Sequence, residues 1–337
     1  MKRLALVSVL VGVVACGNKV KGPPLAPLPP DDKVEELPKP DPTPKVDEPP
    51  ARPVPVGPLD LKIAPRTITV KLVNPGRGKR LPLKVAPKQG GTQTVELALD
   101  FGVTQSLAGS TDPEDTQVDL VPTVVLSGKA EAKTVAADGA EFVLAIDKAD
   151  AIEVKDAKVP MAKFREVLAS TVGLQISGKI GSNGATGEIT MRLEKQAEAS
   201  AQVLDLVRLT LPAWPPLPTE AVGVGAKWQA TTEFKLADRL DVKSITDYEV
   251  TAFKAGVWTI KGTTKVTGAD QQMQGGKISK IAGSGTVELT ITDGQMFPTF
   301  KQRLETTFSA SEAAPKEPNP PRIDFKIVIG AAVTAKS

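Results

Sequence analysis

The sequence contains no histidine and only one cysteine, Cys16, among its 337 residues. Without histidine the chain lacks the commonest general base, the serine–histidine nucleophile pair and the commonest metal ligand. A single cysteine can form no disulfide within the chain and no cysteine-based metal site. Enzymatic chemistry would have to come from carboxylates, lysine or serine, and we expect neither a cofactor nor a metal.

Aromatic residues and charge of one sign are also scarce. The chain has nine phenylalanines, three tryptophans and one tyrosine, and its formal net charge at pH 7 is +3. A nucleic-acid-binding surface would carry clustered lysine and arginine, so we predict no nucleic-acid partner. After the N-terminal segment, no apolar run is long enough to span a bilayer.

The N-terminus has the pattern of a bacterial export signal that ends at the cysteine. Lys2 and Arg3 precede an apolar stretch over residues 4–14, and small residues lead directly to Cys16. This arrangement resembles the lipobox of bacterial lipoproteins. The resemblance implies that residues 1–15 are removed and that the Cys16 thiol carries fatty acyl chains such as palmitate. The alternative is an ordinary secretory signal with a cysteine near the cut by chance.

The residues after the cysteine bear on which membrane holds the chain. In lipoproteins of this kind an aspartate directly after the acylated cysteine tends to retain the protein at the inner membrane, and here Gly17 and Asn18 follow. The resemblance therefore implies a lipid anchor in the outer membrane, facing the periplasm. A multiply acylated cysteine buries enough hydrocarbon for durable anchoring.

A proline-rich tether separates this anchor from the body. Residues 21–58 hold 14 of the 30 prolines and no aromatic residue, so they can bury too little apolar surface to offset the entropy of ordering. We expect residues 16–58 to be the lipidated cysteine and a disordered linker; the alternative is that the tract binds cell wall or a partner domain. Residues 59–337 form the body, with two subdomains possible that meet near 212–218.

Alternating apolar and polar residues predict antiparallel strands along most of the body. The clearest runs lie at residues 95–101, 141–146, 174–176 with 189–193, 248–252 with 257–261, 287–291 with 297–308, and 323–329. Turn residues between the paired runs favour hairpins.

Two segments have helical spacing instead, at residues 159–171 and 196–209. The predicted fold class is α+β: mainly antiparallel β, as one large curved sheet or two sheets, with two short helices. The proline-rich stretch 211–218 follows the second helix, and we expect its Trp214 and Leu217 to pack on the sheet.

The segment around this stretch resembles an uncharacterised family of bacterial lipoproteins. The residues that carry the resemblance are Leu217, Pro218, Val222, Gly225 and Trp228, followed by strands with Gly283, Gly285 and the Asp293-Gly294 turn. Ala226 stands where a polar residue is expected. The resemblance covers roughly residues 90–335 and implies a β-rich run of strands. It implies no activity or site residues, because none is established for the family.

Three short patterns could carry chemistry, and each has a plainer interpretation. The acidic cluster at 112–119 could offer oxygen ligands to calcium, but it lacks the glycine and terminal glutamate of the known loop and is typical of a solvated turn. The Gly-Lys pair at 276–277 lacks the rest of a phosphate loop, and Ser284 lacks the glycine spacing of a nucleophile elbow. Trp228 and Trp258 lie in alternating strands, which favours core packing over an exposed carbohydrate platform.

These observations favour a non-enzymatic, membrane-anchored lipoprotein with a periplasmic, β-rich body. The first hypothesis is a scaffold that binds an envelope protein partner. The second is a carrier or receptor that shelters acyl chains or another hydrophobic ligand in a concave sheet crossed by helices, an analogy at fold level. The third is an envelope hydrolase that uses carboxylates or a serine–lysine pair.

Overall fold

The computed structural model describes residues 58–195, 200–211, 214–236, 239–273, 276–312 and 322–336. The chain divides into two units, Met1–Pro55 and Val56–Ser337, and every described residue belongs to the second. The predicted signal, Cys16 and nearly all of the predicted linker lie outside the described residues. None of the helices that the structure describes combines the length and the apolar character needed to cross a bilayer.

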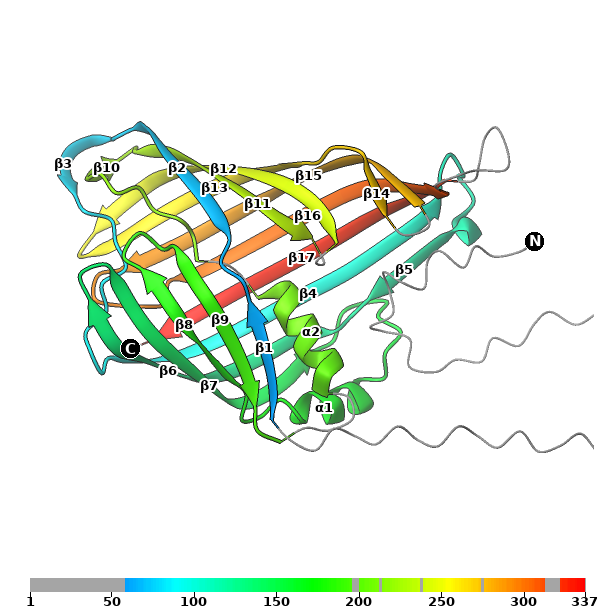
Figure 1. Ribbon diagram of the computed structural model, residues 1–337, viewed down its shortest axis with the longest axis horizontal. Helices are drawn as coiled ribbons and strands as arrows, with labels where there is room; N and C mark the ends of the chain where they lie inside the picture. Colours follow the sequence, from blue (N-terminus) through cyan, green and yellow to red (C-terminus); the bar gives the residue numbers. More distant parts are fainter. Residues whose placement is uncertain are drawn as a thin grey trace, which may run out of the picture. The chain divides into compact units, whose positions relative to one another are not determined.

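One antiparallel sheet dominates the second unit (Figure 1). In the order of hydrogen-bonded neighbours, its main strands are β1 (Leu59–Ile63), β9 (Thr186–Leu193), β8 (Gln175–Gly181), β7 (Gly139–Ile152), β6 (Thr123–Ala136), β4 (Thr92–Leu107), β17 (Ile323–Lys336), β16 (Thr299–Glu312), β15 (Gly276–Thr292), β13 (Val257–Thr267), β12 (Leu240–Lys254), β11 (Lys227–Leu236) and β2 (Thr67–Asn74). Two short strands join it, β5 (Thr116–Leu120) beside β4 and β14 (Gln271–Met273) beside β15. A separate pair is formed by β3 (Arg77–Leu81) and β10 (Val222–Val224).

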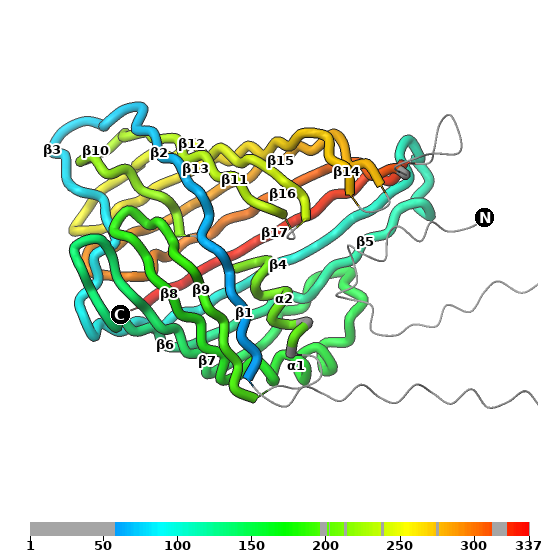
Figure 2. The backbone as a smooth tube through the Cα atoms, in the orientation of Figure 1, coloured from blue at the N-terminus to red at the C-terminus, as the bar shows by residue number. Residues whose placement is uncertain are grey.

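The two edge strands of the sheet are neighbours in the sequence. β1 begins the sheet order and β2 ends it, yet only residues 64–66 separate them. The four steps from Ile63 to Thr67 reach at most about 14 Å. The sheet must therefore curl until its first and last strands approach each other, and Figure 2 shows the blue trace running directly from one to the other.

Two helices follow strands of the first half of the sheet, α1 (Met161–Ala169) and α2 (Ser200–Thr210). α2 contacts β1 at the sheet edge, β4 and β17 in the middle of the sheet, and α1. Buried side chains lie on several of its sides, among them Val203, Leu204 and Val207. A helix with this burial is enclosed by other elements, so α2 lies inside the curl of the sheet.

Glycines and bulges let the long strands bend. β15 carries a register shift between Ser279 and Ala282, and a Cβ atom built on Gly285 would lie 2.5 Å from the Arg303 carbonyl oxygen of β16. Only glycine permits this approach, and bulges add local twist. Bending at these points turns a long sheet back on itself.

The predicted strands are confirmed, with some ends shifted by one or two residues, and the two strands of each predicted hairpin pair antiparallel. Residues 159–171 contain α1, and the described part of 196–209 lies in α2. Of the two arrangements left open, the structure has one large curved sheet. The α+β class fits only loosely, because helices make up a small part of a mainly antiparallel β fold.

Candidate functional site

The inner face of the curled sheet is apolar. On each long strand, alternate residues are buried or partly buried, while their neighbours point outward and carry the charges. The inward positions of β4, β17, β13, β12 and β11 carry no charged side chain. The interior thus offers apolar surface with few groups that could take part in acid–base chemistry.

The main apolar cluster, to which α2 contributes Val203, Leu204 and Val207, lies at one end of this interior, which we call the helix-filled end. Trp214 packs there with ring centroids 5.4 Å from Phe142 and 4.8 Å from Phe297, and its Nε1 donates to the Met296 carbonyl oxygen at 3.3 Å. The buried Gln93 accepts from the backbone N–H groups of Met296 and Phe297, each at 2.9 Å. The Trp214 and Gln93 side chains at this end thus have hydrogen-bond partners, as buried polar groups in a protein core usually do.

A second apolar cluster lies at the opposite end of the long strands, and we call it the far cluster. All its members come from strands, and no helix contributes to it. Its buried residues are Val103, Leu236, Leu240, Val242, Val266, Ile278, Ile281, Phe308, Ala310, Phe325 and Ile327. The described part of this cluster is therefore built from strands alone.

Between the two ends runs a row of inward residues that are paired strand to strand, which we call the middle row. Its members, in sheet order, are Phe101, Ile329, Leu304, Gly285, Thr264, Thr246, Ala230 and Val70. Most of them are only partly buried, including the three largest apolar side chains. Solvent therefore reaches part of the apolar surface of this row, although the row lies on the inner face.

The middle row is apolar at one side and small or polar at the other. Phe101, Ile329 and Leu304 lie side by side on β4, β17 and β16. Gly285 has no side chain, and the hydroxyls of Thr264 and Thr246 bond to each other at 2.8 Å. An apolar surface flanked by a few hydroxyls is the usual composition of a site for a hydrophobic ligand.

Arg66 is a cation at the seam where β1 leads into β2. It is in phase with the inward residues Ile68 and Val70, and its Cζ atom lies 5.0 Å from the ring centroid of Phe234. Burial lowers the pKa of the Arg66 guanidinium, yet the residue as a whole remains exposed. Both are true of a group that protein surrounds while solvent still reaches it.

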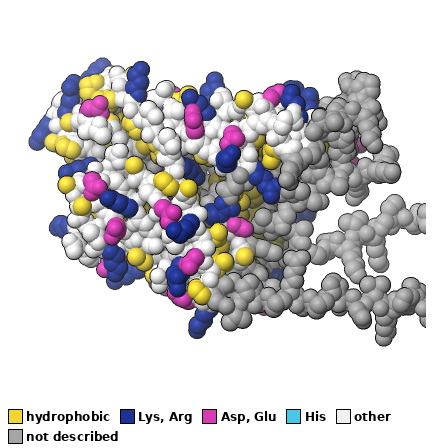
Figure 3. Space-filling model, in the orientation of Figure 1, with side chains coloured by type: hydrophobic (Ala, Val, Ile, Leu, Met, Phe, Trp, Pro, Cys, Tyr) yellow, Lys and Arg dark blue, Asp and Glu magenta, His cyan; other side chains and the backbone are white. Residues whose placement is uncertain are grey.

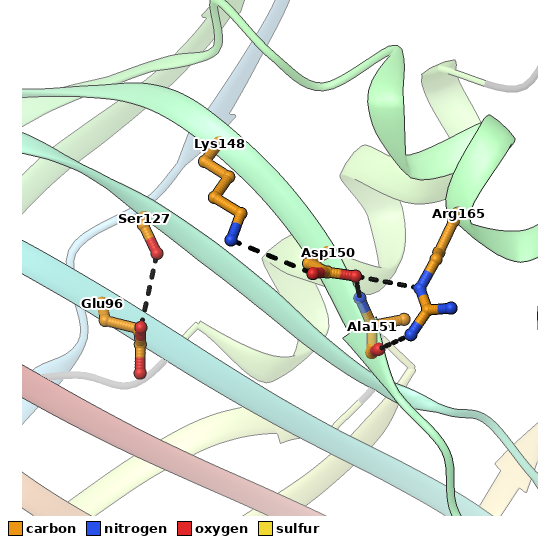
Figure 4. Close-up of polar contacts among 6 residues, drawn as sticks. All are labelled: Glu96, Ser127, Lys148, Asp150, Ala151 and Arg165. Carbon is orange, nitrogen blue, oxygen red and sulfur yellow. Dashed lines mark hydrogen bonds and ion pairs between the residues drawn. The ribbon is translucent and has the colours of Figure 1, made fainter.

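Helix α1 is held to β7 by a polar contact at its outer side (Figure 4). Arg165 Nε donates to Asp150 Oδ1 at 2.9 Å, and Arg165 NH2 donates to the Ala151 carbonyl oxygen at 3.0 Å. The pKa of Asp150 is lowered by the backbone N–H of Ala151 and then by Arg165. Lys148 lies at 4.0 Å from the same carboxylate. These contacts attach α1 to β7, and each of the charged groups in them has a partner.

The outer face carries charges of both signs, interspersed (Figure 3). Many form ion pairs between neighbouring strands, such as Lys62 with Glu188 at 2.9 Å and Lys261 with Glu288 at 3.2 Å. Their side chains are largely exposed, so each pair contributes little to stability. Charges of both signs therefore lie close together over much of the side that Figure 3 shows, while β3 carries three exposed cations, Arg77, Lys79 and Arg80.

The sequence patterns with possible chemistry are placed as follows. The acidic cluster forms a capped 3₁₀ turn at Pro113–Asp115, in which the Asp112 side chain accepts from Glu114 N at 2.9 Å. Lys277 pairs with Asp270 at 2.8 Å, and Ser284 lies on an exposed position of β15. Within the described ranges, no three acidic residues gather in a way that could hold a metal ion.

The expectations for the tryptophans are confirmed. Trp228 and Trp258 are each 1% exposed, and Trp228 stacks on Tyr248 with centroids 5.2 Å apart. Trp214 and Leu217 are also buried in the main core. Burial raises the pKa of Tyr248, which keeps its hydroxyl neutral.

The sequence patterns missed both Arg66 and the partial exposure of the middle row. An alternating strand shows which residues face inward, but nothing in it shows whether a second layer covers them. Arg66 belongs to no motif. The only available signal was its position, two residues before Ile68 in the same alternation.

No protein family matches the chain, and no curated protein matches it. Three outer-membrane proteins are among the structurally similar chains. OprG from Pseudomonas aeruginosa has a TM-score of 0.18 and 8% identity over 74% of this chain and 96% of its own. OccK11 (OpdR) from the same organism has a TM-score of 0.22 and 7% identity over 76% and 100%, and an outer membrane channel from Pseudomonas putida F1 has 0.16 and 9% over 74% and 97%. These TM-scores are too low to support a shared fold or function.

Proposed function

We propose that this protein is a non-enzymatic envelope lipoprotein whose curled sheet binds a hydrophobic ligand, such as an acyl chain, over the middle row. In this proposal the acylated Cys16 anchors the chain at the outer membrane, facing the periplasm. The proline-rich linker lets the body extend away from the membrane surface. The sequence supports the anchor, and the geometry of the inner face supports the ligand.

The partial exposure of the apolar inward side chains carries the proposal. Many apolar side chains of the same face are buried, but Phe101, Ile329 and Leu304, which lie side by side, are only partly buried. Burying a methylene group contributes about 0.8 kcal/mol. A twelve-carbon chain that is fully buried could therefore gain roughly 9 kcal/mol, which exceeds the cost of association at the low end of its range, about 4 kcal/mol.

The chemistry of the interior supports binding over catalysis. The inward strand positions carry no paired carboxylates, and Ser284 lies on an exposed position of β15. A hydrolase would need a positioned acid and base near the bound substrate. The middle row instead offers hydrocarbon, backbone and a few hydroxyls.

The test uses the full chain with Cys16→Ala, which removes the predicted acylation site and permits work without detergent. We expect the fluorescence of N-phenyl-1-naphthylamine, a neutral apolar probe, to rise on binding, and native mass spectrometry to detect lipid that copurifies. A protein that neither binds the probe nor carries lipid would overturn the proposal in favour of the scaffold hypothesis.

A matched pair of variants locates the binding. Ile329→Gln changes a residue of the middle row, while Val328→Gln changes its neighbour on the outward side of the same strand. We expect the first to weaken probe binding by about tenfold and the second to leave it within about twofold, since a polar group in the apolar row loses transfer free energy. Equal effects would place the probe outside the curl.

The anchor is tested separately. The intact mass of the protein from its native host should match a chain that begins at Cys16 with added fatty acyl groups. An unmodified Cys16, or an uncut precursor, would contradict the lipoprotein part of the proposal.

A further inference from the structure

Arg66 occupies a special position in the curl. It ends the three-residue link between the two edge strands, and it shares the inward phase of Ile68 on β2. Phe234, over which it lies, packs against the far cluster and is only partly buried. The guanidinium is therefore close to the apolar interior and still open to solvent.

No described carboxylate neutralises Arg66. Arg66 shares this lack of a described partner with exposed arginines such as Arg80, whereas Arg165 pairs with Asp150. Protein around the guanidinium lowers the pKa of Arg66, while its exposed surface remains in contact with solvent. A guanidinium that stacks on an aromatic ring and has no described counter-ion is free to pair with an anion.

Polar groups that could assist an anion lie on the neighbouring strands. Thr232 of β11 pairs in register with Ile68 of β2 and with Ser244 of β12, one inward position from Phe234. Their hydroxyls can donate to an oxygen atom, and neither has a hydrogen bond within the described residues. The guanidinium itself presents donors in a planar fork that matches a carboxylate or a phosphate.

From this arrangement we infer that the ligand of the interior is an anionic amphiphile, whose carboxylate or phosphate binds Arg66 while its acyl chain lies on the apolar inward side chains. The inference rests on the proposed function and specifies the class of its ligand. A carboxylate would identify a fatty acid, and a phosphate monoester would identify a phospholipid-like head group.

The experiment measures how three ligands with the same chain displace N-phenyl-1-naphthylamine from the full chain carrying Cys16→Ala. Laurate and dodecyl phosphate are anionic, and dodecanol is neutral. We expect the two anions to bind about tenfold more tightly than dodecanol, with an advantage that falls as salt is added because charge-assisted contacts near solvent are screened. If only one anion has this advantage, it identifies the head group.

Three variants assign the effect to the guanidinium. Arg66→Gln should remove about tenfold of the affinity for the anions and leave dodecanol within about twofold, and Arg66→Lys should retain part of the preference. Arg80→Gln, which removes an exposed guanidinium on β3, should change nothing. Thermal unfolding of each variant shows that it is folded, and the dodecanol arm shows that the apolar site is intact.

The outcomes separate the two proposals. If neither the probe nor dodecanol binds the parent protein, the proposed function fails. If both bind but the anions have no advantage, or if Arg66→Gln weakens dodecanol as much as laurate, the proposed function stands and the inference about Arg66 is wrong.

Discussion

The helix-filled end and the middle row belong to the same face of the same strands, but they differ in what covers them. On β4, the inward residues Leu97 and Leu99 are 3% and 2% exposed, whereas the next one, Phe101, is only partly buried. On β17, Val333 and Ala331 are buried and Ile329 is not. The strand sequence keeps most of the inward positions apolar, and the main apolar cluster with its helix residues buries those at one end. The covered end can supply stability, and the uncovered row is free to supply binding.

The sharpest test of this contrast truncates one leucine in each region. Leu204 of α2 is 0% exposed, while Leu304 of β16 lies in the middle row. We expect Leu204→Ala to lower the free energy of unfolding by about 2–5 kcal/mol, because it removes buried hydrocarbon and leaves a cavity. Leu304→Ala should cost about 1 kcal/mol, since less surface is buried there.

The measurement is denaturant unfolding of the full chain, together with probe affinity. Leu304→Ala should weaken probe binding severalfold despite its small effect on stability. Equal losses of stability for the two variants would mean that both regions are core, and the distinction would be lost.

The next prediction concerns the bend of β15 at Gly285, a residue of the middle row. Gly285→Ala would place a Cβ atom 2.5 Å from the Arg303 carbonyl oxygen and 3.1 Å from Leu304 Cδ1. The backbone must shift, so we expect a loss of about 1–3 kcal/mol in the free energy of unfolding. Gly187→Ala on β9 is the control, because its nearest neighbour is at 3.4 Å, and it should be neutral or slightly stabilising. A stable Gly285→Ala variant would show that this bend does not depend on glycine.

Much of the fold could be predicted from the sequence, because strand alternation and helical spacing are local. The inward residues of β4, β7 and β17 follow directly from their period of two. Closure of the curl could not be predicted, since it depends on β1 and β2 pairing with strands more than a hundred residues away. The middle row emerges only when eight strands come into register, and no short segment records which part of that face a helix will cover.

The same limit applies to Arg66. A single arginine after Ala64 and Pro65 resembles any exposed turn residue. Its meaning comes from Phe234, which is 168 positions later in the sequence than Arg66 and is brought under it by the pairing of β2 with β11. The apolar surroundings of the Arg66 guanidinium form only when distant strands pair, so the local sequence does not show them.

The smallest expected effect concerns how α1, which belongs to the helix-filled end, is attached to β7. The folded-state pKa of Asp150 is below its unfolded value, so its contacts stabilise the fold above the unfolded pKa and lose that effect as pH falls through the folded pKa. Arg165→Gln should therefore lower stability slightly at neutral pH, by a small fraction of the Leu204→Ala effect, because the pair is exposed and screened. The difference from the parent should narrow as pH falls through the lowered pKa of Asp150, without vanishing, since Arg165 also donates to the Ala151 carbonyl. Urea unfolding from neutral to acidic pH measures it, with Lys163→Gln on the same helix as the control. A difference that stays constant with pH would mean that the bond to the Ala151 carbonyl, and not the ion pair, fastens the helix to the sheet.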